Sequence, residues 1–175
     1  TRMTSLKSMA LFARSEYGES RFNYKLFPEK NILSFDNFVL RNSGNDIKWT
    51  MFRDCFMQSI VKNRMDLEIS ASRPSIVFLN GQYWGIRNIR EKINEDFLES
   101  NANVNADKVD MLEYVHHNSE VLVLEGSAND FNTMISYIDI HDMANNEYYS
   151  YVKSMMDIDN FIQYQVAQIY YDNSD

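Results

Sequence analysis

SIVFLNGQYWGIRNIR, residues 75–90, is the stretch of sequence that decides the fold. Residues 75–79 are rich in β-branched and aromatic side chains, which favour a strand. Asn80-Gly81 is the dipeptide preferred in a two-residue type I′ turn, because both positions of that turn need positive φ. Residues 82–90 supply the returning strand, so the stretch predicts an antiparallel β-hairpin.

The sequence before the hairpin predicts two further strands and one helix. Short apolar patterns at residues 6–12, which include Lys7, and at residues 35–40, which lead to Arg41, predict strands separated by a polar loop. After the turn-forming residues 42–46, Thr50 can cap a helix over residues 51–62. We expect positions 52, 56 and 60 of this helix to pack against the hairpin, and Cys55 to be a buried thiol.

The second half of the chain is mostly helical. Asn94 opens a short helix, and residues 109–115 and 121–124 have strand composition. Ser127 and Asp130 resemble a capping box before an apolar stripe, and residues 147–156 continue as a helix. Asp157 is a good N-cap for a last helix that runs to residue 171. Strands, a helix and a hairpin followed by helices predict an α+β fold, with a sheet-rich front and a helical back.

Size and charge narrow the classes of function. The 175 residues are 45% apolar and 14% aromatic, enough for one domain or two small lobes. A net charge of −8 excludes binding to the phosphate backbone of nucleic acid and favours basic or neutral partners. No apolar run approaches the length of a membrane span, and one cysteine cannot form a disulfide within the chain.

Several familiar sites are not supported by the residues present. His116-His117 and His141 are the only histidines, and no Cys or Glu lies at a metal-ligand spacing from them, so a solvated loop is the better interpretation. Asn80-Gly81 and Gly85 do not form a phosphate-binding loop. Ser43 lacks the Gly-x-Ser-x-Gly context of an activated nucleophile.

The last helix leads into Asp172-Asn173-Ser174-Asp175, and an Asn-x-Asp loop after a helix can present a catalytic acid. The same residues can also cap and solvate a helix end, and periodicity alone favours that interpretation.

Eight segments of the chain form one further pattern: Leu6-Lys7-Ser8, residues 22–27, 39–46, Arg53-Asp54, Ser72-Arg73-Pro74, residues 78–85, Arg90-Glu91-Lys92 and residues 157–161. Taken together, these segments resemble the spore-coat CotH kinase family, and the likeness covers nearly the whole chain. The resemblance implies a secreted or surface-associated atypical protein kinase that transfers phosphate from ATP, with Mg or Mn, to Ser or Thr of a protein, for which a Ser-rich substrate is a candidate. It also implies a small lobe at residues 1–93 and the start of a helical large lobe at 94–175.

The resemblance gives roles to particular residues. Lys7 would contact the nucleotide phosphates, although it also fits an ordinary surface lysine. Asp54 would hold Lys7 in place, or would only pair with Arg53 or Lys62 on a solvated face. Arg90-Glu91-Lys92 would cross between the lobes beside the adenine, or form a charged strand end. Asp175 would orient the substrate hydroxyl.

The chain also departs from the family pattern. The family's phosphate loop should precede Lys7, and the further metal ligands should follow Asp175. We therefore expect a fragment that is inactive by itself, from a protein found outside the cell, on its surface or in a spore coat.

Two other classes of function stay open. One is a nucleotide-binding pseudokinase, and the other is an adhesin or coat scaffold that uses a tyrosine-rich face around residues 148–156.

Overall fold

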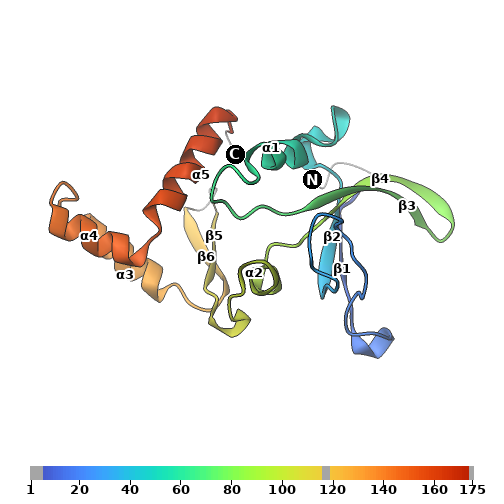
Figure 1. Ribbon diagram of the computed structural model, residues 1–175, viewed down its shortest axis with the longest axis horizontal. Coiled ribbons are helices and arrows are strands. Elements are labelled where there is room, and N and C mark those ends of the chain that lie inside the picture. Colours follow the sequence, from blue (N-terminus) through green and yellow to red (C-terminus); the bar gives the residue numbers. More distant parts are fainter. Residues whose placement is uncertain (1–5, 116–118, 174–175) are drawn as a thin grey trace.

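A computed structural model describes residues 6–115 and 119–173, and it confirms an α+β fold with its main sheet in the first part of the chain and helices later (Figure 1). The strands are β1 (Met9–Phe12), β2 (Asn37–Arg41), β3 (Ser72–Leu79), β4 (Gln82–Arg90), β5 (Met111–Val115) and β6 (Glu120–Glu125). The α-helices are α1 (Arg53–Val61), α2 (Glu95–Ala102), α3 (Asn129–Ile140), α4 (Asn146–Met155) and α5 (Ile158–Tyr170), and short 3₁₀ helices span Ser15–Tyr17, Gly44–Lys48 and Ala106–Lys108. No helix among these described residues is long and apolar enough to cross a membrane.

The main sheet is antiparallel, with strand order β1-β2-β4-β3. The predicted hairpin is confirmed, because β3 and β4 pair from Ser72↔Arg90 to Leu79↔Gln82. Asn80 and Gly81 both have positive φ, as a type I′ turn requires. Because β4 is a central strand, its last residue, Arg90, lies between β2 and β3 and is held from both sides.

The core of the sheet region comes partly from the segment predicted as a polar loop. Phe27 is fully buried, and it packs with Leu26, Phe35 and Ala71. Phe22 pairs with Phe35 in an isolated bridge and stacks edge-on against Phe38 of β2. The segment therefore covers one face of the sheet. Its aromatic residues were visible in the sequence, but they lacked the regular period that marks a strand or helix.

Helix α1 forms near the predicted position, but the predicted cap and packing face are wrong. Its N-cap is Phe52, which makes no side-chain cap, and the Arg53 N–H is instead bound by the Asp46 carboxylate at 3.0 Å. Phe52 and Phe56 are about half exposed, at 54% and 51%. The helix turns Asp54 and Gln58 toward the sheet, where Arg90 and Ser70 need polar partners, and Val61 is buried. Cys55 is only half-buried.

The later part of the chain contains the two-stranded β5–β6 sheet and the helices α3, α4 and α5 (Figure 1). Asp157 caps α5 as predicted, with its carboxylate accepting from Asn160 N. The predicted capping box at the start of α3 is wrong, because the N-cap is Ala128, and the Ser127 hydroxyl accepts from the Asn129 N–H at 3.4 Å without being the N-cap. Between α3 and α4, Tyr137 and His141 stack at 4.0 Å and contact Tyr148, so part of the tyrosine-rich segment packs within the structure.

Candidate functional site

The site centres on Asp54, which lies on α1 and faces the end of the main sheet. Its carboxylate forms a short ion pair with Arg90 of β4 and a second, at 3.4 Å, with Arg41 at the end of β2. The amide of Gln58, one turn later in α1, donates to the same carboxylate at 2.9 Å. One acid thus connects a helix to two strands.

The two arginines differ in exposure, and the difference separates their roles. The Arg90 side chain is 5% exposed, whereas that of Arg41 is 50% exposed. Arg90 also donates to the side-chain and backbone oxygens of Ser70, both at 3.3 Å, so it anchors the strand ends. Arg41 keeps an exposed guanidinium beside the acid, where a ligand can reach it. Sequence reasoning missed Arg41 as a site residue, although it noted that the second strand ends there.

Lys7 lies at the same end of the sheet as Arg41. The pairing of β1 with β2 begins at Met9↔Leu40, and Asn42 extends it, since its backbone N–H donates to Ser8 Oγ at 3.0 Å and its side chain donates to the Leu6 carbonyl at 2.5 Å. The Lys7 side chain is exposed. The structure therefore brings Lys7 and Arg41 to the same end of the sheet. Asp54 contacts Arg90, Arg41 and Gln58. The Lys7–Asp54 ion pair stays a prediction.

Arg87 of β4 holds the backbone at Lys7. Its side chain is 1% exposed, lies 5.3 Å over the Trp84 ring, and donates from Nε to the Lys7 carbonyl at 3.2 Å. Burial lowers the pKa of this guanidinium from its ordinary value. Gly85 leaves room for it, because a Cβ at Gly85 would lie 3.1 Å from Arg87 Nη1 and 3.2 Å from Leu6 Cδ2. The contacts of the Arg87 side chain thus fix the backbone around Lys7.

Glu91 is buried, and its carboxylate joins three segments of the chain. It accepts from Lys30 Nζ at 2.6 Å, from the Ala71 backbone N–H at 2.8 Å and from Asn101 Nδ2 at 3.2 Å. The segment before β2, the entry to β3 and helix α2 therefore meet at one carboxylate. The Glu91 backbone is engaged as well, because its N–H donates to the Ala71 carbonyl at 3.4 Å and its carbonyl accepts from Ser70 Oγ at 2.9 Å.

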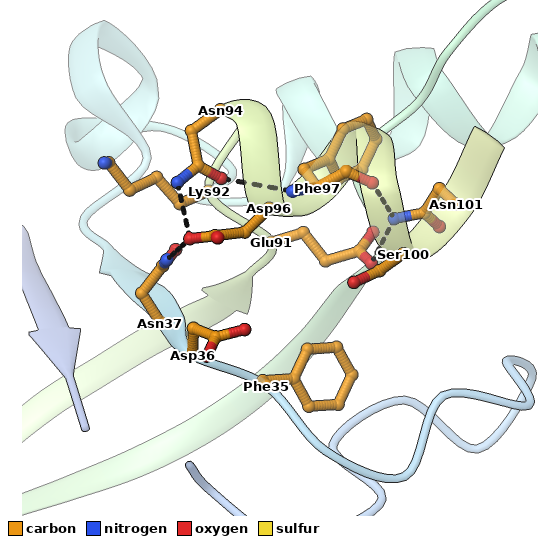
Figure 2. A pocket seen from close by; sticks show the side chains of 10 residues that line it. All are labelled: Phe35, Asp36, Asn37, Glu91, Lys92, Asn94, Asp96, Phe97, Ser100 and Asn101. Atoms are coloured by element: carbon orange, nitrogen blue, oxygen red, sulfur yellow. Dashed lines mark hydrogen bonds between the residues drawn. The ribbon is translucent and has the colours of Figure 1, made fainter. Parts of the chain in front are cut away.

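Figure 2 shows the small pocket on which Glu91 borders, between the start of β2 and helix α2. Asn37 of β2 donates to Asp96 of α2 at 2.7 Å, and Asn94 caps the helix from the same wall. The cavity measures about 20 Å³, roughly the space for a single water molecule, so it does not hold a nucleotide base. A larger cavity of about 250 Å³ shares Asn101 with it and extends along residues 62–69.

Asp46 organises the loop between β2 and α1. It is 5% exposed, and its carboxylate accepts from the Thr50 hydroxyl, from the Thr50 N–H at 3.2 Å and from the Arg53 N–H at 3.0 Å. Burial alone would raise the pKa of Asp46, but these hydrogen bonds and the nearby Arg53 guanidinium outweigh it and lower the pKa to about 2. The ionised carboxylate fixes the first turn of α1, and with it Asp54.

Two predicted features fall outside what the structure describes. Asp175, the proposed catalytic acid, and the histidine pair at residues 116–117 lie beyond the described residues. Within residues 6–115 and 119–173, no group of three or more His, Cys, Asp or Glu residues could hold a metal ion. A metal site built from three or more such side chains is therefore absent from the described residues, and the Mg or Mn that the resemblance implies stays a prediction.

The family model described as CotH kinase protein matches residues 5–175. The chain belongs to the CotH kinase family. No curated protein and no solved structure matched the chain.

In this CotH family chain, basic and acidic residues are distributed unequally between the first and second parts of the sequence. The prediction from the sequence considered only the net charge of the whole chain. Residues 1–93 carry 15 Lys and Arg against 9 Asp and Glu, whereas residues 94–175 carry 2 against 16. The whole-chain value of −8 therefore conceals a basic part that contains the Arg41–Asp54 site and a strongly acidic, mostly helical part. Counting the charged residues separately in each part of the sequence would have revealed this difference.

Proposed function

We propose that the intact protein is an ATP-dependent protein kinase that phosphorylates Ser or Thr, and that Lys7 and Arg41 contact the nucleotide phosphates. The observation that carries the proposal is the ion pair of Arg41 with Asp54, in which a cation at the end of a sheet strand is held by an acid on the following helix. Phosphoryl transfer depends mainly on placing cations against the phosphates and on aligning the attacking hydroxyl. Membership of the CotH kinase family supports the same reaction.

Asp175 is the residue proposed to orient the substrate hydroxyl. It follows α5 by sequence, five residues after Tyr170. A carboxylate there would accept a hydrogen bond from the hydroxyl and direct its oxygen toward the γ-phosphate. This role, like the requirement for Mg or Mn, is part of the proposal.

The charge of residues 94–175 supports a basic protein as the substrate. With 16 acidic and 2 basic residues, this region attracts Lys- and Arg-containing segments and repels acidic ones. A serine- or threonine-containing basic segment fits both this field and the proposed reaction. We propose substrates of this kind together with a location of the protein outside the cell or in a coat.

The proposed reaction is tested by Asp175→Asn in the intact protein. We expect phosphate transfer from radiolabelled ATP to a basic, serine-rich protein to fall by about 10²- to 10⁴-fold, the usual contribution of a general base. ATP affinity, measured separately by calorimetry, should change little. Asp172→Asn is the matched control, since it removes one negative charge three residues away. Transfer by Asp175→Asn at the unsubstituted rate would contradict the role of Asp175, and absence of transfer by the unsubstituted protein would contradict the function.

A further inference from the structure

Helix α5 is amphipathic, but the side that it turns toward the rest of the chain is the polar one. The Asp66 N–H donates to Gln163 Oε1 at 2.7 Å, and the Asp66 carbonyl accepts from Asn160 Nδ2. Ala167, on the same side of the helix, is buried. The opposite side exposes four apolar side chains, which we call the apolar face of α5: Phe161, Ile162, Val166 and Ile169. This helix therefore presents to solvent the kind of surface that a helix normally buries.

Helix α1 and the residues just before it show the same inversion. Asp54 and Gln58 turn toward the sheet, whereas the rings of Phe52 and Phe56 are about half exposed, with their centroids 6.1 Å apart. Trp49 lies three residues before Phe52 and is 77% exposed. We call Trp49, Phe52 and Phe56 the aromatic face of α1. Three large aromatic side chains exposed so close together in the sequence are typical of a surface that another molecule covers.

The aromatic face of α1 lies in a basic segment. Residues 47–65 contain one acid, Asp54, whose carboxylate is paired with Arg90 and Arg41. The ion pairs that Arg53 and Lys62 form within the chain are long, at 3.4 Å and 3.8 Å. The segment contains four cations with exposed or half-exposed side chains: Lys48, Arg53, Lys62 and Arg64. Its outward charge is therefore positive.

The apolar face of α5 lies in an acidic part of the chain. Residues 126–173, which include α3, α4 and α5, contain one cation, Lys153. They contain seven acids, all exposed: Asp130, Asp139, Asp142, Glu147, Asp157, Asp159 and Asp172. One chain thus carries an exposed apolar face among acids and an exposed aromatic face among cations.

The two faces do not meet within one chain, because α1 and α5 contact each other through other residues. The Tyr171 hydroxyl donates to the Met57 carbonyl at 2.8 Å, and Figure 1 shows the end of α5 beside α1. Both faces stay exposed despite this contact. We infer that the apolar face of α5 in one copy of the protein packs on the aromatic face of α1 in a second copy, with acids of the first copy beside cations of the second.

A second copy fits these surfaces because the chain itself carries both halves of the complementary pair. Apolar side chains supply the central contact, and the opposite charges at its margin disfavour partners of the wrong charge. The contact joins two different surfaces, so each copy keeps one further face free, and copies add head to tail into a ring or an open chain. Association of this kind does not require the proposed kinase activity.

The test is analytical ultracentrifugation of the intact protein and two double variants. We expect the unsubstituted protein to associate with rising concentration between about 1 and 500 μM. Trp49→Ser with Phe56→Ser, and separately Ile162→Ser with Ile169→Ser, should each weaken association by about tenfold or more, because each pair removes the centre of one face. The control is Tyr17→Ser, which removes an 84% exposed aromatic side chain elsewhere and should change nothing. Equal thermal midpoints verify that the variants are folded.

An equimolar mixture of the two double variants provides the sharpest measurement. Each variant keeps the face that the other lacks, so the mixture should form a 1:1 complex and no larger species, with a dissociation constant within about threefold of the unsubstituted contact. Lys48→Glu reverses one exposed charge beside the aromatic face and should weaken association several-fold.

Three results would overturn the inferred contact. The first is an unsubstituted protein that stays monomeric over the whole concentration range, and the second is a mixture of the double variants that stays monomeric, since the two faces then do not bind each other. The third is association of Lys48→Glu at the unsubstituted strength, which would remove the charge complementarity that selects a second copy. Binding of a monomer to phosphatidylserine vesicles through Trp49 would assign the aromatic face to a lipid surface and would also overturn the contact.

Discussion

Asp54 of α1 and Arg90 of β4 are hydrogen-bonded and ion-paired although 36 residues separate them in the sequence. Because the Arg90 side chain is 5% exposed, its charge depends on this partner and on Ser70 for compensation. The end of the central strand β4 and the helix α1 are therefore fixed to each other, and Glu91, which follows Arg90, begins the path toward α2.

Asp54→Asn should destabilise the protein by about 1–3 kcal/mol, because it leaves a buried guanidinium without its counter-charge. Urea unfolding measures this change. Asp139→Asn, which alters an exposed acid of α3, should stay within about 0.5 kcal/mol. Equal stabilities of the two variants would show that Arg90 does not need the ionised partner.

Arg41→Met should weaken ATP binding by about 10- to 100-fold and leave adenosine binding unchanged, because the exposed guanidinium is proposed to meet phosphate oxygens and not the base. Calorimetric titration with ATP, ADP and adenosine distinguishes a phosphate ligand from a general effect on the site. Arg64→Met, at an exposed position after α1, is the control. A similar loss of affinity for adenosine and ATP would contradict a phosphate contact.

Glu91→Gln should destabilise the protein by about 2–4 kcal/mol, since it removes the charge that pairs with Lys30 and places an amide among groups that donate. Thermal and urea unfolding both report this loss. Glu99→Gln on the exposed face of α2 should have little effect. A Glu91 variant as stable as the Glu99 variant would refute the joining role of this carboxylate.

The acid stability of the protein should depend on Asp46. The pKa of Asp46 falls from 3.8 to about 2 on folding, so the folded state binds its proton less tightly than the unfolded state does. This contribution to stability is fully present above about pH 4 and is lost as the pH falls toward 2. The stability difference between the unsubstituted protein and Asp46→Asn, followed by urea unfolding from pH 6 to 2, should therefore shrink below pH 4. A constant difference would contradict the assignment.

The turn and the helix caps that depend on neighbouring residues could be predicted from the sequence. The Asn80-Gly81 turn, the Asp157 cap of α5 and the Asn94 cap of α2 depend on residues within a few positions, and all three are present. The family resemblance is confirmed by the match over residues 5–175. The roles of Lys7, Asp54 and Asp175 in phosphate transfer stay predictions.

The features of α1 that could not be predicted from the sequence depend on contacts between distant segments of the chain. Asp46, and not Thr50, satisfies the first turn of α1, because the loop returns seven residues later to place Arg53 N–H beside it. The inward face of α1 is set by the buried Arg90, so its polar residues Asp54 and Gln58 turn inward while Phe52 stays half exposed. Hydrophobic periodicity assumes that apolar residues face the core, and it fails where a buried charge needs a partner.

Strand β3 lies at one edge of the main sheet, and it carries exposed Ile76 and Phe78. An open edge with apolar side chains is a template on which a second molecule can add a strand, and such growth leads to aggregation. Pro74 has no N–H to offer to an incoming strand, and the irregularity between Ile76 and Phe78 bends the edge away from a straight ladder. Replacing Pro74 would thus threaten solubility at high concentration more than it would threaten the fold.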